Sequence, residues 1–136
     1  MKFSGEAIKK LREIGVGVVY YFGSRVQGTA LDHADYDIGV VFVNTENVTI
    51  FPDIFSKLYS ILNEYFPDTI RGPKLDISFL QRANPALSMS AIRYGAVLFE
   101  ASPIFRVNFE EEAVRKYNNY LKIKKVFEEA TLKVFS

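Results

Sequence analysis

The chain has 136 residues, of which 49% are hydrophobic and 24% charged, and its formal net charge at pH 7 is +1. This length fits one domain with a hydrophobic core and leaves little room for a second. A net charge so close to zero gives no global field for nucleic acid or a membrane, and the absence of cysteine excludes disulfides, thiolate metal sites and cysteine nucleophiles. We expect a cytoplasmic protein, because neither a signal peptide nor an apolar run of the roughly 20 residues of a membrane span is visible.

The N-terminal part of the chain predicts a helix, a buried strand and a tight turn. Residues 4–14 alternate charged side chains with apolar ones at the spacing of an amphipathic helix, for which Ser4 is a suitable N-cap. The apolar run over residues 16–22 is typical of a buried strand. Gly23 then permits a sharp turn, and we expect Ser24 to cap a short helix over residues 25–30.

The middle of the chain predicts two further strands separated by a helix. An apolar run over residues 38–43 follows directly after Asp35 and Asp37 and predicts the second strand. A broad apolar face over residues 51–65 predicts a helix that Pro67 ends. Residues 74–80 alternate strictly between apolar and polar side chains, so we expect a third strand with Asp76 on its polar face.

The C-terminal third predicts a helix over residues 84–93 with Asn84 as its N-cap, and a short strand over residues 96–100. Ser102 and Pro103 predict the opening of a further turn. Residues 108–136 contain neither Gly nor Pro, which predicts a long terminal helix. A stripe on this helix would pack on the domain or on a partner in a homo- or hetero-oligomer; its members are Tyr117, Tyr120, Leu121 and Phe127.

Three aspartates and a glycine-serine turn are the candidate functional residues. Asp35 and Asp37 are two positions apart, so on a strand they would share a face. Carboxylates that converge with Asp76 would repel one another, and divalent cations remove that cost. Oxygen ligands without His or Cys favour Mg²⁺ or Mn²⁺ over Zn²⁺. The turn before a helix N-terminus offers N–H groups to phosphate oxygens.

Each of these residues also has a structural interpretation. A lone aspartate is most often solvated at a loop or sheet edge, and Arg25 lies either beside a phosphate or on the surface. Gly39 either leaves space for a nucleotide or packs tightly against a helix. His33, close to Asp35, is expected to be solvated rather than a ligand.

The sequence contains Gly23 and Ser24, then ten intervening residues, then Asp35 and Asp37, with Asp76 in a later strand. This order resembles the nucleotidyltransferase superfamily that includes DNA polymerase β. The small size of the chain resembles the minimal nucleotidyltransferases, which are antitoxins of HEPN-domain ribonucleases. Residues 92–100 resemble the helix-turn-strand that follows the catalytic part of that group. Val26 and Gln27 stand where the group often has Ala and Arg, and Ala34 stands where it often has Ser.

The resemblance implies a nucleotidyltransferase fold, a mixed α/β domain over residues 1–136 with a small mixed sheet flanked by helices. It assigns Gly23, Ser24 and Arg25 to nucleotide binding, and Asp35 and Asp37 to two Mg²⁺ ions, with Mn²⁺ as an alternative. Asp76 would bind one ion and activate the attacking hydroxyl.

The resemblance also implies a reaction and a partner. AMP would pass from ATP to a tyrosine hydroxyl of a cognate HEPN toxin, with release of pyrophosphate. Two alternatives stay open: an aminoglycoside-type nucleotidyltransferase, and a catalytically idle module that blocks the toxin by contact alone.

Overall fold

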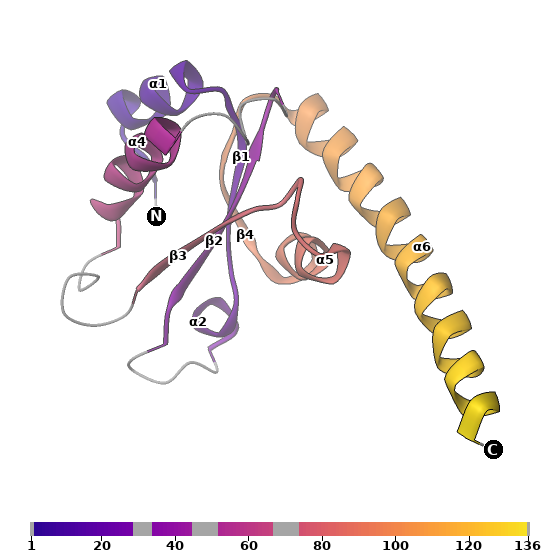
Figure 1. Ribbon diagram of the computed structural model, residues 1–136. Coiled ribbons are helices and arrows are strands. Elements are labelled where there is room, and N and C mark those ends of the chain that lie inside the picture. The colour runs from indigo at the N-terminus through magenta and orange to yellow at the C-terminus, as the bar shows by residue number, and fades with distance from the viewer. Residues whose placement is uncertain (1, 29–33, 45–51, 67–73, 136) are drawn as a thin grey trace.

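The structure is a computed structural model that describes residues 2–28, 34–44, 52–66 and 74–135. Its four described strands form one sheet in the order β3-β2-β1-β4 (Figure 1). The strands are β1 (Val16–Phe22), β2 (Tyr36–Phe42), β3 (Leu75–Phe79) and β4 (Ala96–Glu100). β1 pairs antiparallel with both β2 and β4, whereas β2 and β3 are parallel. The predicted small mixed sheet is therefore confirmed.

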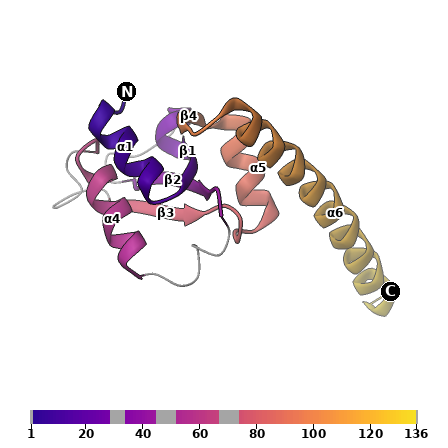
Figure 2. The same cartoon turned by 90° about the horizontal axis from the view of Figure 1, so that it is seen from above.

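Helices cover both faces of this sheet, and Figure 2 shows the resulting three layers. α1 (Gly5–Glu13) and α4 (Pro52–Asn63) lie on one face. α5 (Pro85–Tyr94) and the first half of α6 (Pro103–Phe135) lie on the other. The short α2 (Ser24–Gln27) follows the end of β1. The mixed α/β class is confirmed, and no described helix is long and apolar enough to cross a membrane.

Two apolar layers hold the helices on the sheet, because alternate residues of each strand face opposite sides. On the α1 and α4 side, Ile38 and Val40 of β2 are fully buried with Leu11 and Leu58. On the α5 and α6 side, Val18 and Tyr20 of β1 pack with Val41, Leu80 and Ala91. This second face also carries the polar positions of β2 and β3 that hold the candidate site.

The predicted caps of α1 and α5 are confirmed. Ser4 precedes α1, and its Oγ accepts a hydrogen bond from the N–H of Ala7 at 3.1 Å. Asn84 precedes α5, and its Oδ1 accepts from the N–H of Ala86 at 2.8 Å. Both satisfy an N–H group that the helix itself leaves without a partner.

The terminal helix begins earlier than predicted. The predicted start at residue 108 is wrong, because α6 starts at Pro103 and runs without a break to Phe135, so the turn that Ser102 and Pro103 open is the first turn of this helix. The Oγ of Ser102 accepts from the N–H of Phe105 at 3.1 Å, and a proline is well suited to the first helical position. This start places Arg106 beside Glu100 of β4 and one turn before Glu110, whose Oε1 is 3.2 Å from Nη1 of Arg106.

Candidate functional site

Asp37 and Asp76 are brought together by the parallel pairing of β2 and β3. They are register partners, as are Ile38 and Ile77 one residue further along. Ile38 and Ile77 point into the core beneath α1 and α4. The two aspartates therefore face the opposite side of the sheet, where Asp37 is half-buried and Asp76 is exposed.

Asp35 lies at the same end of this strand pair, one residue before β2 begins. Its Oδ1 accepts a hydrogen bond from the N–H of Lys74 at 3.1 Å. Lys74 precedes β3 directly, and its carbonyl oxygen accepts from the N–H of Tyr36 at 2.8 Å. These two bonds fix the start of β2 against the start of β3. All three carboxylates therefore lie at the end of the sheet where β2 and β3 begin.

The side chain of Asp37 lies in an environment that disfavours its charged form. Partial burial raises the pKa of Asp37, and the negative charges of Asp76 and Asp35 raise it further. In the described part of the chain, no three acidic or histidine side chains converge closely enough to hold a metal ion by themselves. The cluster fits the usual mode of Mg²⁺, which binds one or two carboxylates together with substrate phosphates.

Gly23 makes room for Asp37 where β1 ends. Its backbone has φ 87° and ψ −167°, a region that only glycine adopts readily. A Cβ atom at this position would lie 2.1 Å from Oδ2 of Asp37. The predicted sharp turn is confirmed. Glycine is required at this position by the backbone conformation and also because the carboxylate of Asp37 fills the space that a side chain would need.

The expectation for Ser24 needs a correction. Ser24 is the first residue of α2 rather than its N-cap, because Gly23 takes the cap position without a side-chain hydrogen bond. The helix ends at Gln27 rather than continuing to residue 30, since Gly28 adopts a left-handed conformation. Arg25 lies in α2, but its side chain and residues 29–33, including His33, are outside the described part of the chain.

Two further glycines shape the surroundings, and the sequence indicated only one of them. A Cβ on Gly39 would lie 2.8 Å from Cδ1 of Leu80, so its lack of a side chain serves packing, although against Leu80 rather than a helix. A Cβ on Gly95 would lie 3.1 Å from both the Cβ of Phe22 and the carbonyl oxygen of Tyr21. The end of α5 therefore abuts the end of β1, immediately before the Gly23 turn.

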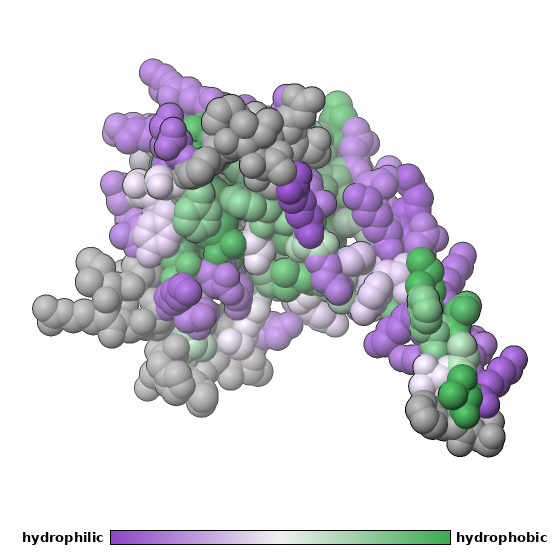
Figure 3. Space-filling view, viewed as in Figure 1, coloured by the Kyte–Doolittle hydropathy of each residue, from purple (hydrophilic) through white to green (hydrophobic). Residues whose placement is uncertain are grey.

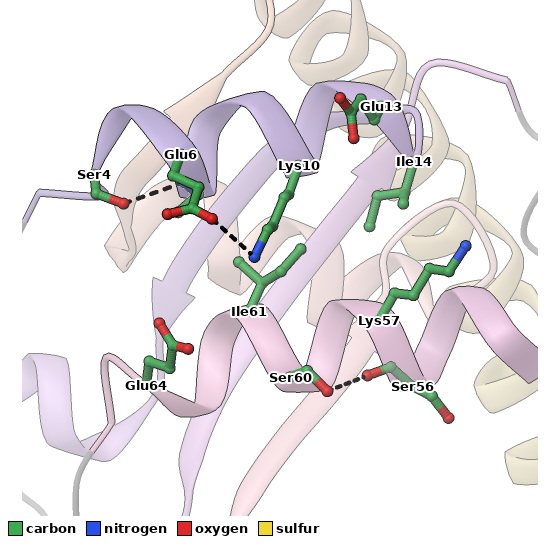
Figure 4. A pocket seen from close by; sticks show the side chains of 11 residues that line it. Ser4, Glu6, Lys10, Glu13, Ile14, Ser56, Lys57, Ser60, Ile61 and Glu64 are labelled. Atoms are coloured by element: carbon green, nitrogen blue, oxygen red, sulfur yellow. Dashed lines mark hydrogen bonds and ion pairs between the residues drawn. The ribbon is translucent and has the colours of Figure 1, made fainter.

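A groove of about 630 Å³ between α1 and α4 lies on the opposite face of the sheet from the aspartates (Figure 4). One of its ion pairs joins Nζ of Lys10 to Oε1 of Glu6 within α1, at 3.4 Å. In α4 the Oγ of Ser60 donates to the carbonyl oxygen of Ser56. We assign this groove no part in the chemistry.

Sequence comparison identifies a family and finds no similar curated protein. The profile of the family "Polymerase beta, Nucleotidyltransferase" matches residues 6–104, a segment that contains the Gly23 turn and all three aspartates. No curated protein matches the sequence closely enough to be considered a relative.

Several solved structures share the fold. A toxin-antitoxin crystal structure with AMP-PNP is 23% identical, with a TM-score of 0.59 and 95% of each chain covered. A toxin-antitoxin pair MntA-HpeT, in which two aspartates with one residue between them are changed to glutamate, is 20% identical, with a TM-score of 0.58 and coverage of 96% of this chain and 97% of that one. A tri-AMPylated Shewanella oneidensis HEPN toxin in complex with MNT antitoxin is 19% identical, with a TM-score of 0.57 and coverage of 96% and 94%.

Proposed function

The chain belongs to the polymerase β nucleotidyltransferase family, and on that premise we propose that it transfers AMP from ATP to a tyrosine hydroxyl of a HEPN-family toxin, as an antitoxin. The observation that carries the proposal is the placement of Asp37. Its carboxylate lies beside Asp76 on the next strand and against the backbone of Gly23. A triphosphate seated at the Gly23 turn would thus lie next to the acidic cluster.

Each residue of the cluster has a role in this reaction. The N–H groups of the Gly23 turn and the Ser24 hydroxyl bind phosphate oxygens of the triphosphate. Asp35 and Asp37 would hold Mg²⁺ together with phosphate oxygens of the bound triphosphate, and Asp76 would be a further ligand of one ion. The ions would supply charge stabilisation to the attacking and leaving oxygens. The pKa of Asp37 is raised first by its partial burial and then by the negative charges of Asp76 and Asp35, and a cation bound at this position would offset both effects.

The chemical step is an in-line displacement at the α-phosphorus. The tyrosine oxygen forms a bond to that phosphorus, and its proton passes to Asp76. The bond from the α-phosphorus to the bridging oxygen breaks, and pyrophosphate leaves with the electron pair. Asp76 is exposed, so it can meet an acceptor that arrives on a separate protein and can return its proton to water.

The choice of ATP and of a HEPN toxin rests on the structural neighbours. Their crystal structures contain AMP-PNP in one case and an AMPylated HEPN toxin with an MNT antitoxin in another. The chain has the length of these neighbours as well as their fold, and it covers at least 94% of each.

Intact-mass spectrometry of the candidate toxin tests the proposal. The product of the adjacent reading frame is incubated with Mg-ATP and either the wild-type chain, Asp35→Asn/Asp37→Asn, or Asp53→Asn. Asp53 is an exposed aspartate at the start of α4, on the other face of the sheet, and serves as the matched control.

We expect the wild type and Asp53→Asn to add AMP to the toxin, and the double variant to add none. Neutralisation of the toxin without any mass shift, unchanged in the double variant, would instead identify a binding module. AMP transfer to an aminoglycoside but to no protein would identify a small-molecule enzyme.

A further inference from the structure

The second half of α6 extends away from the three-layered body (Figures 1 and 2). In the first half, Phe105 and Phe109 pack against the sheet and α5, and Ala113 is 5% exposed. From residue 121 to residue 134 every side chain is exposed. A helix of 33 residues is roughly 50 Å long, so this free part extends for about 20 Å.

Large apolar side chains lie on this free part without cover from the described residues. Ile123 is 57% exposed, Phe127 68% and Leu132 70%, and Figure 3 shows hydrophobic residues gathered on this part of the helix. A helical segment of this length is marginal in water on its own, because packing of an apolar face supplies most helical stability in proteins. A second protein surface that covers this apolar face would therefore stabilise the free part of the helix.

The order of charges on the same face indicates what that surface is. Tyr120, Lys124, Glu128 and Leu132 follow one another at intervals of four residues and form a ridge along the helix. Within one chain, Nζ of Lys124 lies 4.0 Å from Oε1 of Glu128. The ridge is apolar at both ends and carries one positive and one negative side chain in the middle. Turning the ridge end for end therefore puts the negative charge where the positive charge was, and the positive charge where the negative one was.

We propose that the Tyr120–Leu132 ridge pairs antiparallel with the same ridge of a second copy of this chain, about a two-fold axis near residue 126. Lys124 then faces Glu128 of the second copy, Glu128 faces its Lys124, and each Tyr120 lies opposite a Leu132. A parallel pairing would instead set lysine against lysine and glutamate against glutamate, which costs free energy. The ridge does not include Asp35, Asp37 or Asp76, so the pairing does not depend on nucleotide transfer.

Charge reversal at the two central positions tests this pairing in the full-length protein. Sedimentation velocity over a concentration series gives the dimer dissociation constant for the wild type, Lys124→Glu, Glu128→Lys and the double exchange. Each single change places four like charges at the axis, so we expect dimerisation to weaken about tenfold. The double exchange and an equimolar mixture of the two single variants should restore it, because both re-create opposite pairs.

Lys122→Glu is the matched control, since it makes the same charge change on the side of the helix away from the ridge. It should leave the dissociation constant within about twofold of the wild type. Far-UV circular dichroism should be the same for every variant, which separates loss of pairing from loss of folding.

Disulfide trapping tests the direction of the pairing, and the absence of native cysteine makes it specific. A mixture of Tyr120→Cys and Leu132→Cys chains should cross-link under mild oxidation, and neither variant should cross-link alone. Efficient cross-linking of either variant alone would indicate a parallel pair. A wild-type chain that stays monomeric at high concentration, or a dimer that does not respond to the charge reversals, would overturn the proposal. The proposal would also be overturned if this face is free in the chain alone and becomes covered only when the toxin binds.

Discussion

Replacement of Gly23 by alanine tests most sharply how the turn and Asp37 depend on each other. Gly23 has φ 87° and ψ −167°, a conformation that costs other residues about 1–3 kcal/mol. The added Cβ would also lie 2.1 Å from Oδ2 of Asp37 and 2.9 Å from its Cγ. Both effects act against the native arrangement, so Asp37 must turn away or the turn must shift.

We expect Gly23→Ala to lower the free energy of unfolding by about 3 kcal/mol, which for a chain of this size lowers the melting temperature by roughly 10 °C. AMP transfer should fall about 100-fold or more, because a catalytic group displaced by about 1 Å can cost that factor. Urea denaturation and a transfer assay, run below the variant's melting temperature, measure the two effects separately.

Gly28→Ala is the matched control for this prediction. Gly28 also has a positive φ, of 75°, but an added Cβ would meet nothing within 4 Å. This variant should lose only about 1 kcal/mol from the left-handed backbone and keep its transfer rate. A Gly23→Ala protein as stable and active as Gly28→Ala would refute the reasoning.

Three further predictions follow from specific contacts. Gly17→Ala places a Cβ 2.2 Å from Cε1 of Phe105, so urea denaturation should show a loss of about 1–3 kcal/mol, against no loss for Gly5→Ala, whose Cβ meets nothing. Tyr20→Phe removes the hydroxyl that donates to Oε1 of Glu110 at 2.8 Å, and should cost about 1 kcal/mol, whereas Tyr94→Phe, at an exposed position, should cost nothing measurable. The pKa of Asp37 is raised above its ordinary 3.8, so the folded state binds this proton more tightly than the unfolded state and stability falls as pH rises from about 3.8 through the raised pKa. In the absence of divalent ions, Asp37→Asn should therefore melt at a higher temperature than the wild type at pH 7, and added Mg²⁺ should stabilise only the wild type; an equal response of both proteins to Mg²⁺ would contradict the assigned role.

The sequence was sufficient to predict most of the fold, because local patterns determine these elements. β4 begins and ends where predicted, and the caps Ser4 and Asn84 work as expected. The start of α6 was wrong because Ser102 and Pro103 signal a turn and a helix start equally well. The contact of Arg106 with Glu100, on the preceding strand, favours the helix start, and that contact depends on tertiary structure.

The candidate site was predictable in its residues but not in its geometry. Alternation along residues 74–80 placed Asp76 on the polar face, and the spacing of Asp35 and Asp37 suggested their association. The register that makes Asp37 and Asp76 partners depends on the parallel pairing of β2 with β3, which no local pattern encodes. The same holds for Gly23, because a glycine in a turn does not reveal that a carboxylate fills the space of its missing side chain.

The central claim, transfer of the nucleotidyl group, is tested most directly by isotopic labelling. The chain and the candidate toxin are incubated with Mg²⁺ and ATP that carries radioactive phosphorus at either the α or the γ position. We predict that label from the α position, and none from the γ position, becomes attached to the toxin, and that Asp76→Asn abolishes this attachment. Label from the γ position on the toxin, or undiminished α label with Asp76→Asn, would contradict the account.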